Sequence, residues 1–114
     1  MLTTTYNNKH KLILLESNSE VENLFSNDIH GQVALNIETT GVDYIKDDIV
    51  GVNVAVSDDE SVQSYYIPLR HKGYNNNLDI HSTLRHVHEL IKTQKVFFFK
   101  RDFVYAFLEK EGYE

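Results

Sequence analysis

The strand predicted over residues 32–38 constrains the fold of this chain more than any other segment. Its apolar side chains occupy every second position, which is the period of a β-strand with one buried face. Asn36 and Glu38 therefore share the other face, and a sharp turn follows at Gly41. An amide and a carboxylate side by side at a strand end suggest a metal site, although a single carboxylate is a weak ligand set for a divalent cation.

Length and composition indicate one ordered domain over residues 1–114, large enough to bury a core. The chain is 41% hydrophobic and has one proline, which is typical of a globular protein. It has no cysteine, which excludes disulfides and cysteine-ligated zinc. Because no apolar run approaches ~18 residues, we expect no membrane association and a cytoplasmic protein.

The net charge of −6 argues against strong, unaided binding to DNA. Eleven basic residues are scattered along the chain, with one short concentration at Lys95, Lys100 and Arg101. A site that grips a few nucleotides of a single strand is still compatible with this charge.

The remaining pattern predicts an α/β fold with a mixed sheet. Strands are expected at residues 11–15, 32–38, 49–56, 61–67 and 96–99. We expect 11–15 to be an edge strand, 32–38 to be central and 96–99 to be buried. Helices are expected at 19–27, with the capping box Ser19-x-x-Glu22, at 80–92, with Asp79 as N-cap, and after Asp102. Strands 32–38, 49–56 and 61–67 should form an antiparallel meander. Strand 96–99 should lie parallel to 32–38, because a crossover helix precedes it.

Three segments, in this order and spacing, resemble the 3'–5' proofreading exonuclease domain of family A DNA polymerases, which belongs to the RNase H-like four-carboxylate exonucleases. They are Asn36-x-Glu38-Thr39-Thr40-Gly41-Val42-Asp43, then Ile49-Val50-Gly51-Val52-Asn53-Val54-Ala55-Val56, then Tyr65-Tyr66-Ile67-Pro68-Leu69-Arg70-His71. The similarity covers roughly Leu12 to Glu114. It implies a truncated RNase H-like domain, with three antiparallel strands, a parallel strand and flanking helices.

The chain departs from the family pattern at several positions. Asn36 stands where the family has its first Asp. Asp102 matches the Asp of the second motif, but Phe98 and Arg101 replace that motif's Asn and aromatic residue. The third motif, with the last carboxylate, would lie beyond Glu114. Two of the four carboxylate positions thus keep a carboxylate, at Glu38 and Asp102.

The resemblance implies catalytic roles for Glu38 and Asp102, and a Mg²⁺ or Mn²⁺ site formed by Asn36, Glu38 and Asp102 that binds weakly or not at all. It further implies substrate contacts from Thr39, Thr40 and Gly41 to a single-stranded DNA 3' end. Glu38 and Asp102 should then approach each other at one end of the sheet.

The residues by themselves leave other roles open. Glu38 is also suited to capping the turn that follows it, and Asp102 to capping the last helix. Alternation places one of Tyr65 and Tyr66 in the core and exposes the other, and Tyr65, Tyr66 and Tyr74 are candidates for stacking on bases.

Three functions follow from these observations. The first is the N-terminal part of a polymerase-type exonuclease domain in DNA replication, inactive by itself. The second is a non-catalytic module that keeps this fold to bind a polymerase or another replication protein, or that forms a homodimer through the truncated edge. The third is a half-enzyme completed by another polypeptide.

Overall fold

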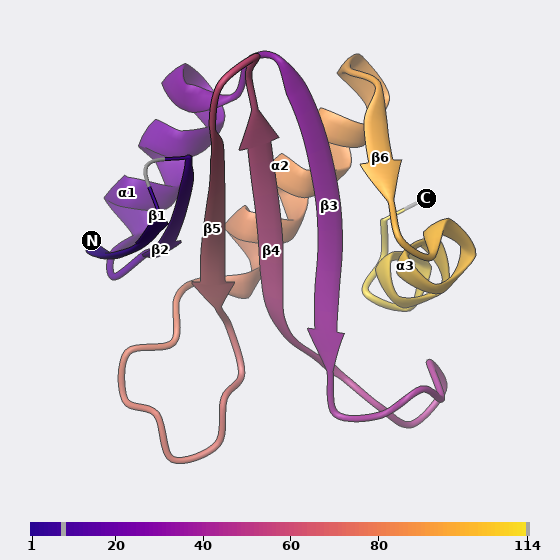
Figure 1. Cartoon of the computed structure of the whole chain (residues 1–114). Coiled ribbons are helices and arrows are strands. Elements are labelled where there is room, and N and C mark those ends of the chain that lie inside the picture. The colour runs from indigo at the N-terminus through magenta and orange to yellow at the C-terminus, as the bar shows by residue number, and fades with distance from the viewer. Residues whose placement is uncertain (8, 114) are drawn as a thin grey trace.

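A six-stranded mixed β-sheet is the framework of the protein in its computed structural model (Figure 1). The structure describes residues 1–7 and 9–113, so Asn8 and Glu114 of the predicted single domain lie outside the described residues. The strand order across the sheet is β1-β2-β5-β4-β3-β6. The elements are β1 (Leu2–Asn7), β2 (His10–Leu14), α1 (Asn18–Asn23), the π-helical turn η1 (Leu24–Asp28), β3 (Gln32–Thr39), β4 (Ile49–Ser57), β5 (Val62–Pro68), α2 (Ile80–Thr93), β6 (Val96–Phe98) and α3 (Arg101–Lys110). The predicted α/β class with a mixed sheet is confirmed.

Strands β3, β4 and β5 form the predicted antiparallel meander. Asn36 pairs with Asn53, and Asn53 pairs in turn with Tyr66 on the next strand. The β4–β5 turn is closed by Asp58, whose Oδ1 accepts hydrogen bonds from the backbone N–H groups of Glu60 and Ser61 at 2.9 and 2.8 Å. A short Asp in this position satisfies turn donors that would otherwise lack a partner.

Helix α2 carries the chain across the sheet to β6, as predicted. Its N-cap is Asp79, whose side chain accepts from the backbone N–H of Ser82 at 3.2 Å. Strand β6 then pairs parallel with β3, in the register Val33 to Val96 and Leu35 to Phe98. This strand–helix–strand unit brings the carboxyl ends of β3 and β6 to the same end of the sheet.

The edge position predicted for residues 11–15 is wrong, because β2 lies inside the sheet. Strand β1 pairs with it antiparallel on one side, and β5 pairs with it parallel on the other. The additional strand contains Thr3, Thr4 and Thr5, whose β-branched side chains suit an extended backbone. Consequently β3 is not central either, since it is the fifth strand in the order and is flanked by β4 and β6.

The expectation of a buried strand at 96–99 is also wrong. Strand β6 ends at Phe98 and forms one edge of the sheet among the described residues. Phe97 is 49% exposed and Phe99 is 83% exposed. A run of three phenylalanines predicts a strand buried on both faces, but only one face of this sheet is covered, so Phe97 shares the open face with Ala34 while Phe98 is level with buried Leu35.

The first helix begins earlier than predicted. Its N-cap is Ser17, whose Oγ accepts from the backbone N–H of Glu20 at 3.1 Å, so the box Ser19-x-x-Glu22 is not the one used. The Glu20 carboxylate accepts from the N–H of Glu16 at 2.7 Å and pairs with the terminal amino group of Met1. This pairing lowers the pKa of Glu20 and fastens the start of the chain to the helix.

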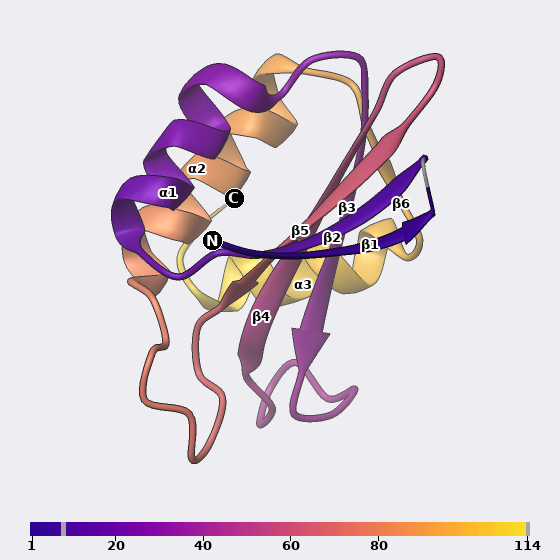
Figure 2. The same ribbon diagram turned by 60° about the vertical axis from the view of Figure 1, so that its left-hand side comes forward.

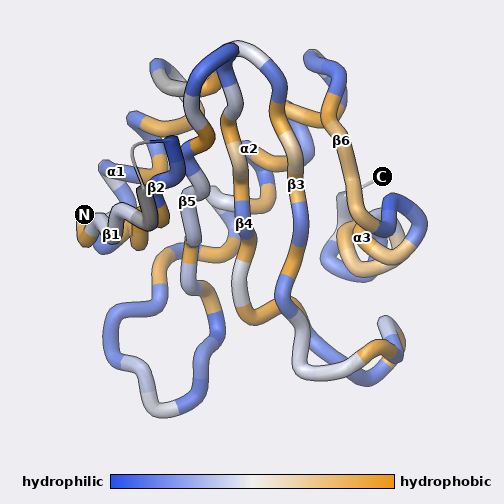
Figure 3. The backbone as a smooth tube through the Cα atoms, in the orientation of Figure 1, coloured by the Kyte–Doolittle hydropathy of each residue, from blue (hydrophilic) through white to orange (hydrophobic). Residues whose placement is uncertain are grey.

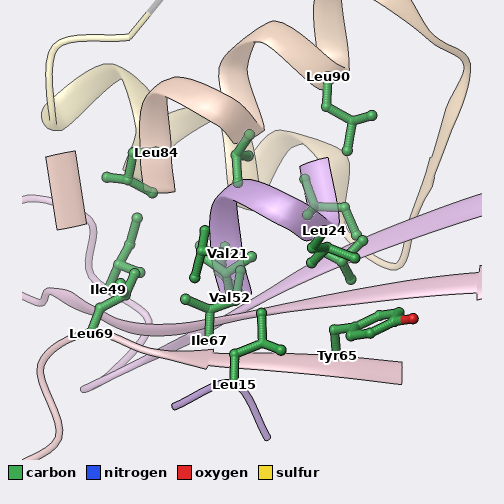
Figure 4. Close-up of a cluster of buried hydrophobic side chains, with 14 of the residues drawn as sticks. Leu15, Val21, Leu24, Ile49, Val52, Tyr65, Ile67, Leu69, Leu84 and Leu90 are labelled. Atoms are coloured by element: carbon green, nitrogen blue, oxygen red, sulfur yellow. The ribbon is translucent and has the colours of Figure 1, made fainter. Parts of the chain in front are cut away.

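The core lies between one face of the sheet and the helices (Figure 2). It is formed by alternate residues of the strands and by the apolar sides of α1, α2 and α3, as Figure 4 shows for part of it. The fully buried side chains include Leu35, Val54, Ile67, Leu84 and Phe107. In contrast, Gln32, Ala34 and Glu38 on the opposite face of β3 are exposed.

Hydrophilic residues dominate the long loop between β5 and α2 (Figure 3). Within the described part of the chain, every helix is too short or too polar to traverse a lipid bilayer. The cytoplasmic location remains a prediction.

Candidate functional site

The predicted site residues follow β3 and β6 in the direction in which both parallel strands run, although β6 ends at Phe98, level with Leu35, and β3 continues to Thr39. The last parallel pair joins Leu35 and Phe98. Glu38 follows three residues after the first of these, and Asp102 follows four residues after the second. Both side chains are exposed. The carboxylates thus leave the sheet at the same end, and their close approach remains a prediction.

Asn36 belongs to a polar row on the sheet face that points away from the core. It is half-buried and lies opposite Asn53, which lies opposite Tyr66. The row supplies two amide groups and a phenol beside Glu38. These groups offer hydrogen-bond donors and acceptors without adding negative charge.

The predicted substrate-binding residues Thr39, Thr40 and Gly41 are engaged in holding their own loop. The Thr39 hydroxyl donates to the carbonyl oxygen of Gly41 at 2.6 Å. The Thr40 hydroxyl donates to Oδ1 of Asp47 at 3.1 Å and accepts from the N–H of Asp48 at 3.0 Å. The Asp47 carboxylate also lies where a side chain at position 41 would project, so a larger residue there would displace this carboxylate.

The loop after β3 is closed by Asp47 rather than by Glu38. Besides Thr40, Asp47 accepts from the backbone N–H of Asp43 at 3.0 Å. Among the described residues, no hydrogen bond joins the Glu38 carboxylate to this turn. The alternative in which Glu38 caps the turn is therefore wrong, and its oxygens are available to a ligand.

The second alternative, Asp102 as the N-cap of the last helix, is also wrong. Helix α3 starts at Arg101, its cap residue is Lys100, and Lys100 makes no side-chain capping bond. Asp102 lies in the first turn, where its negative charge interacts favourably with the helix dipole. Its side chain is exposed and free of a capping role.

The C-terminal end of α3 fixes two loops near the site. Glu111 accepts from Nη1 of Arg70 at 2.7 Å, and Arg70 also reaches the carbonyl oxygen of Ile49 at 3.3 Å. Lys110 donates to the carbonyl oxygen of Asp47. These contacts join the segment after β5 and the loop after β3 to the C-terminal end of α3. Asp102 lies in the first turn of the same helix, eight residues from Lys110 or about 12 Å along the axis.

A pair that sequence reasoning missed lies next to Glu38. The Tyr66 hydroxyl and Nε2 of His71 share a hydrogen bond of 2.5 Å. Burial, together with the negative charge of Glu38, raises the pKa of Tyr66 to about 12. The Tyr66 ring lies over Gly51, where a side chain would collide with it. Gly51 is the residue in the sequence that could have indicated this contact, because a glycine inside a strand often marks the close approach of another group.

A hollow of about 370 Å³ adjoins this pair. Aromatic side chains form much of its wall, together with Lys72. Tyr65, by contrast, is 6% exposed and belongs to the core. Of the two neighbouring tyrosines, Tyr66 is thus the one directed to the open face, in agreement with the predicted alternation.

The residues at the strand ends do not fit a metal pair. Two-metal centres need several carboxylates to hold both cations and to balance their charge. Asn36, Glu38 and Asp102 contribute two carboxylates and one neutral amide. In residues 1–7 and 9–113, no group of three or more His, Cys, Asp or Glu side chains is arranged to hold a metal ion.

No model of a known protein family matches this chain, and no curated protein matches it either.

Proposed function

We propose that this chain functions as the N-terminal part of a polymerase-type 3'–5' exonuclease domain, which receives a single-stranded DNA 3' end without hydrolysing it by itself. The RNase H-like character of the fold is part of this proposal. The observation that supports it most is the parallel pairing of β6 with β3, with Glu38 three residues after the last paired residue of β3 and Asp102 four residues after that of β6.

Two further features support the proposal. The meander, crossover helix, parallel strand and final helix occur in the order that the resemblance implies. The Glu38 carboxylate is exposed and is not used by the turn after β3, so it is available to accept a hydrogen bond from a terminal 3'-hydroxyl. The amides of Asn36 and Asn53 lie on the same face and suit sugar or base edges.

Absence of hydrolysis by the isolated chain follows from the donor set. Phosphodiester cleavage in metal-dependent nucleases depends on electrostatic stabilisation by bound cations. With Asn36 in place of an aspartate, the ligand set loses one negative charge. Only two of the four carboxylates that the resemblance implies, Glu38 and Asp102, are present. The residues present therefore suit recognition of a strand end rather than its cleavage.

The test compares a linear oligothymidylate that has a free 3'-hydroxyl with a covalently closed circle of the same length. Binding is measured by competition against a labelled linear strand at low salt, where phosphate contacts are strongest. We expect tighter binding of the linear strand, and Glu38→Gln should abolish that preference. The matched control is Glu60→Gln, an exposed carboxylate in the β4–β5 turn.

Equal affinity for the linear strand and the circle would overturn the proposal. Metal-dependent shortening of the linear strand by the unmodified chain, lost in Glu38→Ala, would overturn its non-hydrolytic part. Chemical-shift changes at the backbone amides of Thr39, Thr40 and Gly41 on addition of the linear strand would show that its 3' end binds next to the C-terminal end of β3.

A further inference from the structure

Two exposed phenylalanines project from the edge of the sheet beside the candidate site. Phe98, between them, packs against the core and meets Tyr105 edge to face at 5.6 Å between ring centroids. Phe97 and Phe99 are directed away from that core and are 49% and 83% exposed. Exposing two neighbouring aromatic rings to water is unfavourable, so a partner that covers them gains hydrophobic free energy.

Each exposed ring is accompanied by a lysine. Nζ of Lys95 lies 5.5 Å from the centroid of the Phe97 ring, and Nζ of Lys100 lies 5.8 Å from that of Phe99. Arg101 follows directly. The segment 95–101 thus holds three of the eleven basic residues and no acidic residue, in a chain of net charge −6. This local positive charge favours an anionic partner.

The side chains next to Phe97 on the adjoining strands are small. Phe97 lies opposite Ala34, which lies opposite Ala55, and both alanines are small. They line a shallow hollow of about 270 Å³ together with Phe97 and the polar side chains of Gln32 and Ser57. A planar ring stacked on Phe97 would therefore meet no bulky side chain on the neighbouring strands.

The charge also decides against a second copy of this chain as the partner. A two-fold pairing of β6 with itself would bring the basic segment 95–101 against its own copy. Lys95 and Lys100, which flank the edge strand β6, also oppose such strand addition. A single-stranded polynucleotide provides both planar rings and negative charge, and proteins bind it by stacking on aromatic side chains within a basic surface.

We propose that Lys95, Phe97, Phe99 and Lys100 form a stacking platform for single-stranded DNA, called the β6 platform below. The proposal rests on the proposed function, since it places the strand whose 3' end Glu38 receives. Phe97 is level with Ala34, four residues before Glu38 on β3, or about 13 Å along the strand. The β6 platform would thus contact nucleotides on the 5' side of the 3' terminus. Its contribution to binding should therefore be the same for linear and circular DNA.

The first experiment measures binding of a labelled oligothymidylate, about 15 nucleotides long, by fluorescence anisotropy. Phe97→Ala and Phe99→Ala should each weaken binding about 5-fold or more, as expected for loss of one stacked base. The matched control is Leu12→Ala, which removes a 40% exposed apolar side chain from β2 on the same sheet. Thermal melts of every variant show that the fold is retained.

The second experiment addresses the charges. Lys95→Gln with Lys100→Gln should reduce the slope of log K against log salt by about 1.4, which corresponds to two phosphates of a single strand. Lys11→Gln, at an exposed lysine on β2, is the control and should leave the slope unchanged.

A third readout reports stacking directly. The chain contains no tryptophan, so Phe97→Trp introduces a single indole, whose emission can be excited apart from that of the seven tyrosines. This variant should keep the affinity of the unmodified chain, and its emission should be quenched when the oligothymidylate stacks on the indole. A structural role for Phe97 alone would give no quenching.

The outcomes separate this proposal from the proposed function. Unchanged affinity in the Phe97→Ala, Phe99→Ala double variant would overturn the β6 platform, while a remaining preference for linear over circular DNA would leave the proposed function intact. Affinity that depends on the platform but not on a 3' end would overturn the proposed function instead. No binding by the unmodified chain at low salt would overturn both.

Discussion

The hydroxyl oxygen of Tyr66 lies 2.5 Å from Nε2 of His71, across the end of β5 and directly over Gly51. The two rings are tilted by 53° with centroids 5.6 Å apart. This pair connects the sheet face that carries Asn36 and Glu38 to the loop between β5 and α2. It also depends on the absence of a side chain at Gly51.

Gly51→Ala should therefore destabilise the protein by displacing Tyr66. Overpacking of this kind costs about 1–3 kcal/mol, and the midpoint of thermal unfolding should fall by about 4 °C or more. Circular dichroism melts measure the change. In the Gly51→Ala, Tyr66→Ala double variant the two effects should not add, because the ring that collides is already gone. Additive losses would show that Gly51 is needed for another reason.

The stability of the protein should fall at alkaline pH because of Tyr66. Its pKa is raised to about 12 by burial and by the Glu38 charge, so the folded state keeps this proton at a pH where the unfolded chain has lost it. The stabilising contribution is complete below pH about 10 and is lost as the pH rises toward about 12. Urea unfolding at several pH values should show this loss, and Tyr66→Phe should remove it. Glu38→Gln should bring the pKa of Tyr66 closer to its usual range.

Asn36→Asp should strengthen binding of Mg²⁺ or Mn²⁺ at the end of β3. An added carboxylate raises the negative charge of the oxygen ligands, which is one of the factors that set the affinity of such sites for divalent cations. Titration of Mn²⁺ followed by its electron paramagnetic resonance signal measures this affinity. Asn53→Asp adds the same charge on the neighbouring strand and should have a smaller effect. The Asn36→Asp variant should still not degrade DNA at a full rate, because the ligand set lacks the carboxylate of the third motif. Degradation at a full rate would contradict our account of the site.

Ser17→Ala should destabilise the first helix, whereas Ser19→Ala should change little. The Ser17 hydroxyl caps the helix by accepting from the N–H of Glu20, and loss of such a cap costs about 1 kcal/mol. Ser19 makes no capping bond to the backbone among the described residues. Chemical denaturation of the two variants measures the difference. The reverse order of effects would mean that the helix starts where the sequence motif placed it.

The placement of Asn36 and Glu38 on one face of β3 could be predicted from the sequence, but the residues that surround them could not. Alternation along residues 32–38 placed Asn36 and Glu38 on one face, and this required local sequence alone. Tyr66 and His71 come from the end of another strand and from a loop, and their contact depends on how β5 and β4 align. Likewise, the role of Asp47 in closing the turn became visible once Gly41 and Asp47 were seen in contact.

The sequence by itself determined the elements whose signals are local. Asp79 marks the start of α2, and the crossover it begins dictates a parallel partner for β3. Tertiary structure decided which strands lie at the edges. The β1–β2 hairpin joins β5 through parallel pairing of distant segments, and Phe97 is exposed because it shares with Ala34 the sheet face opposite to the core. Local sequence fixes which side chains alternate, but the neighbours that bury or expose them are brought together only by long-range pairing.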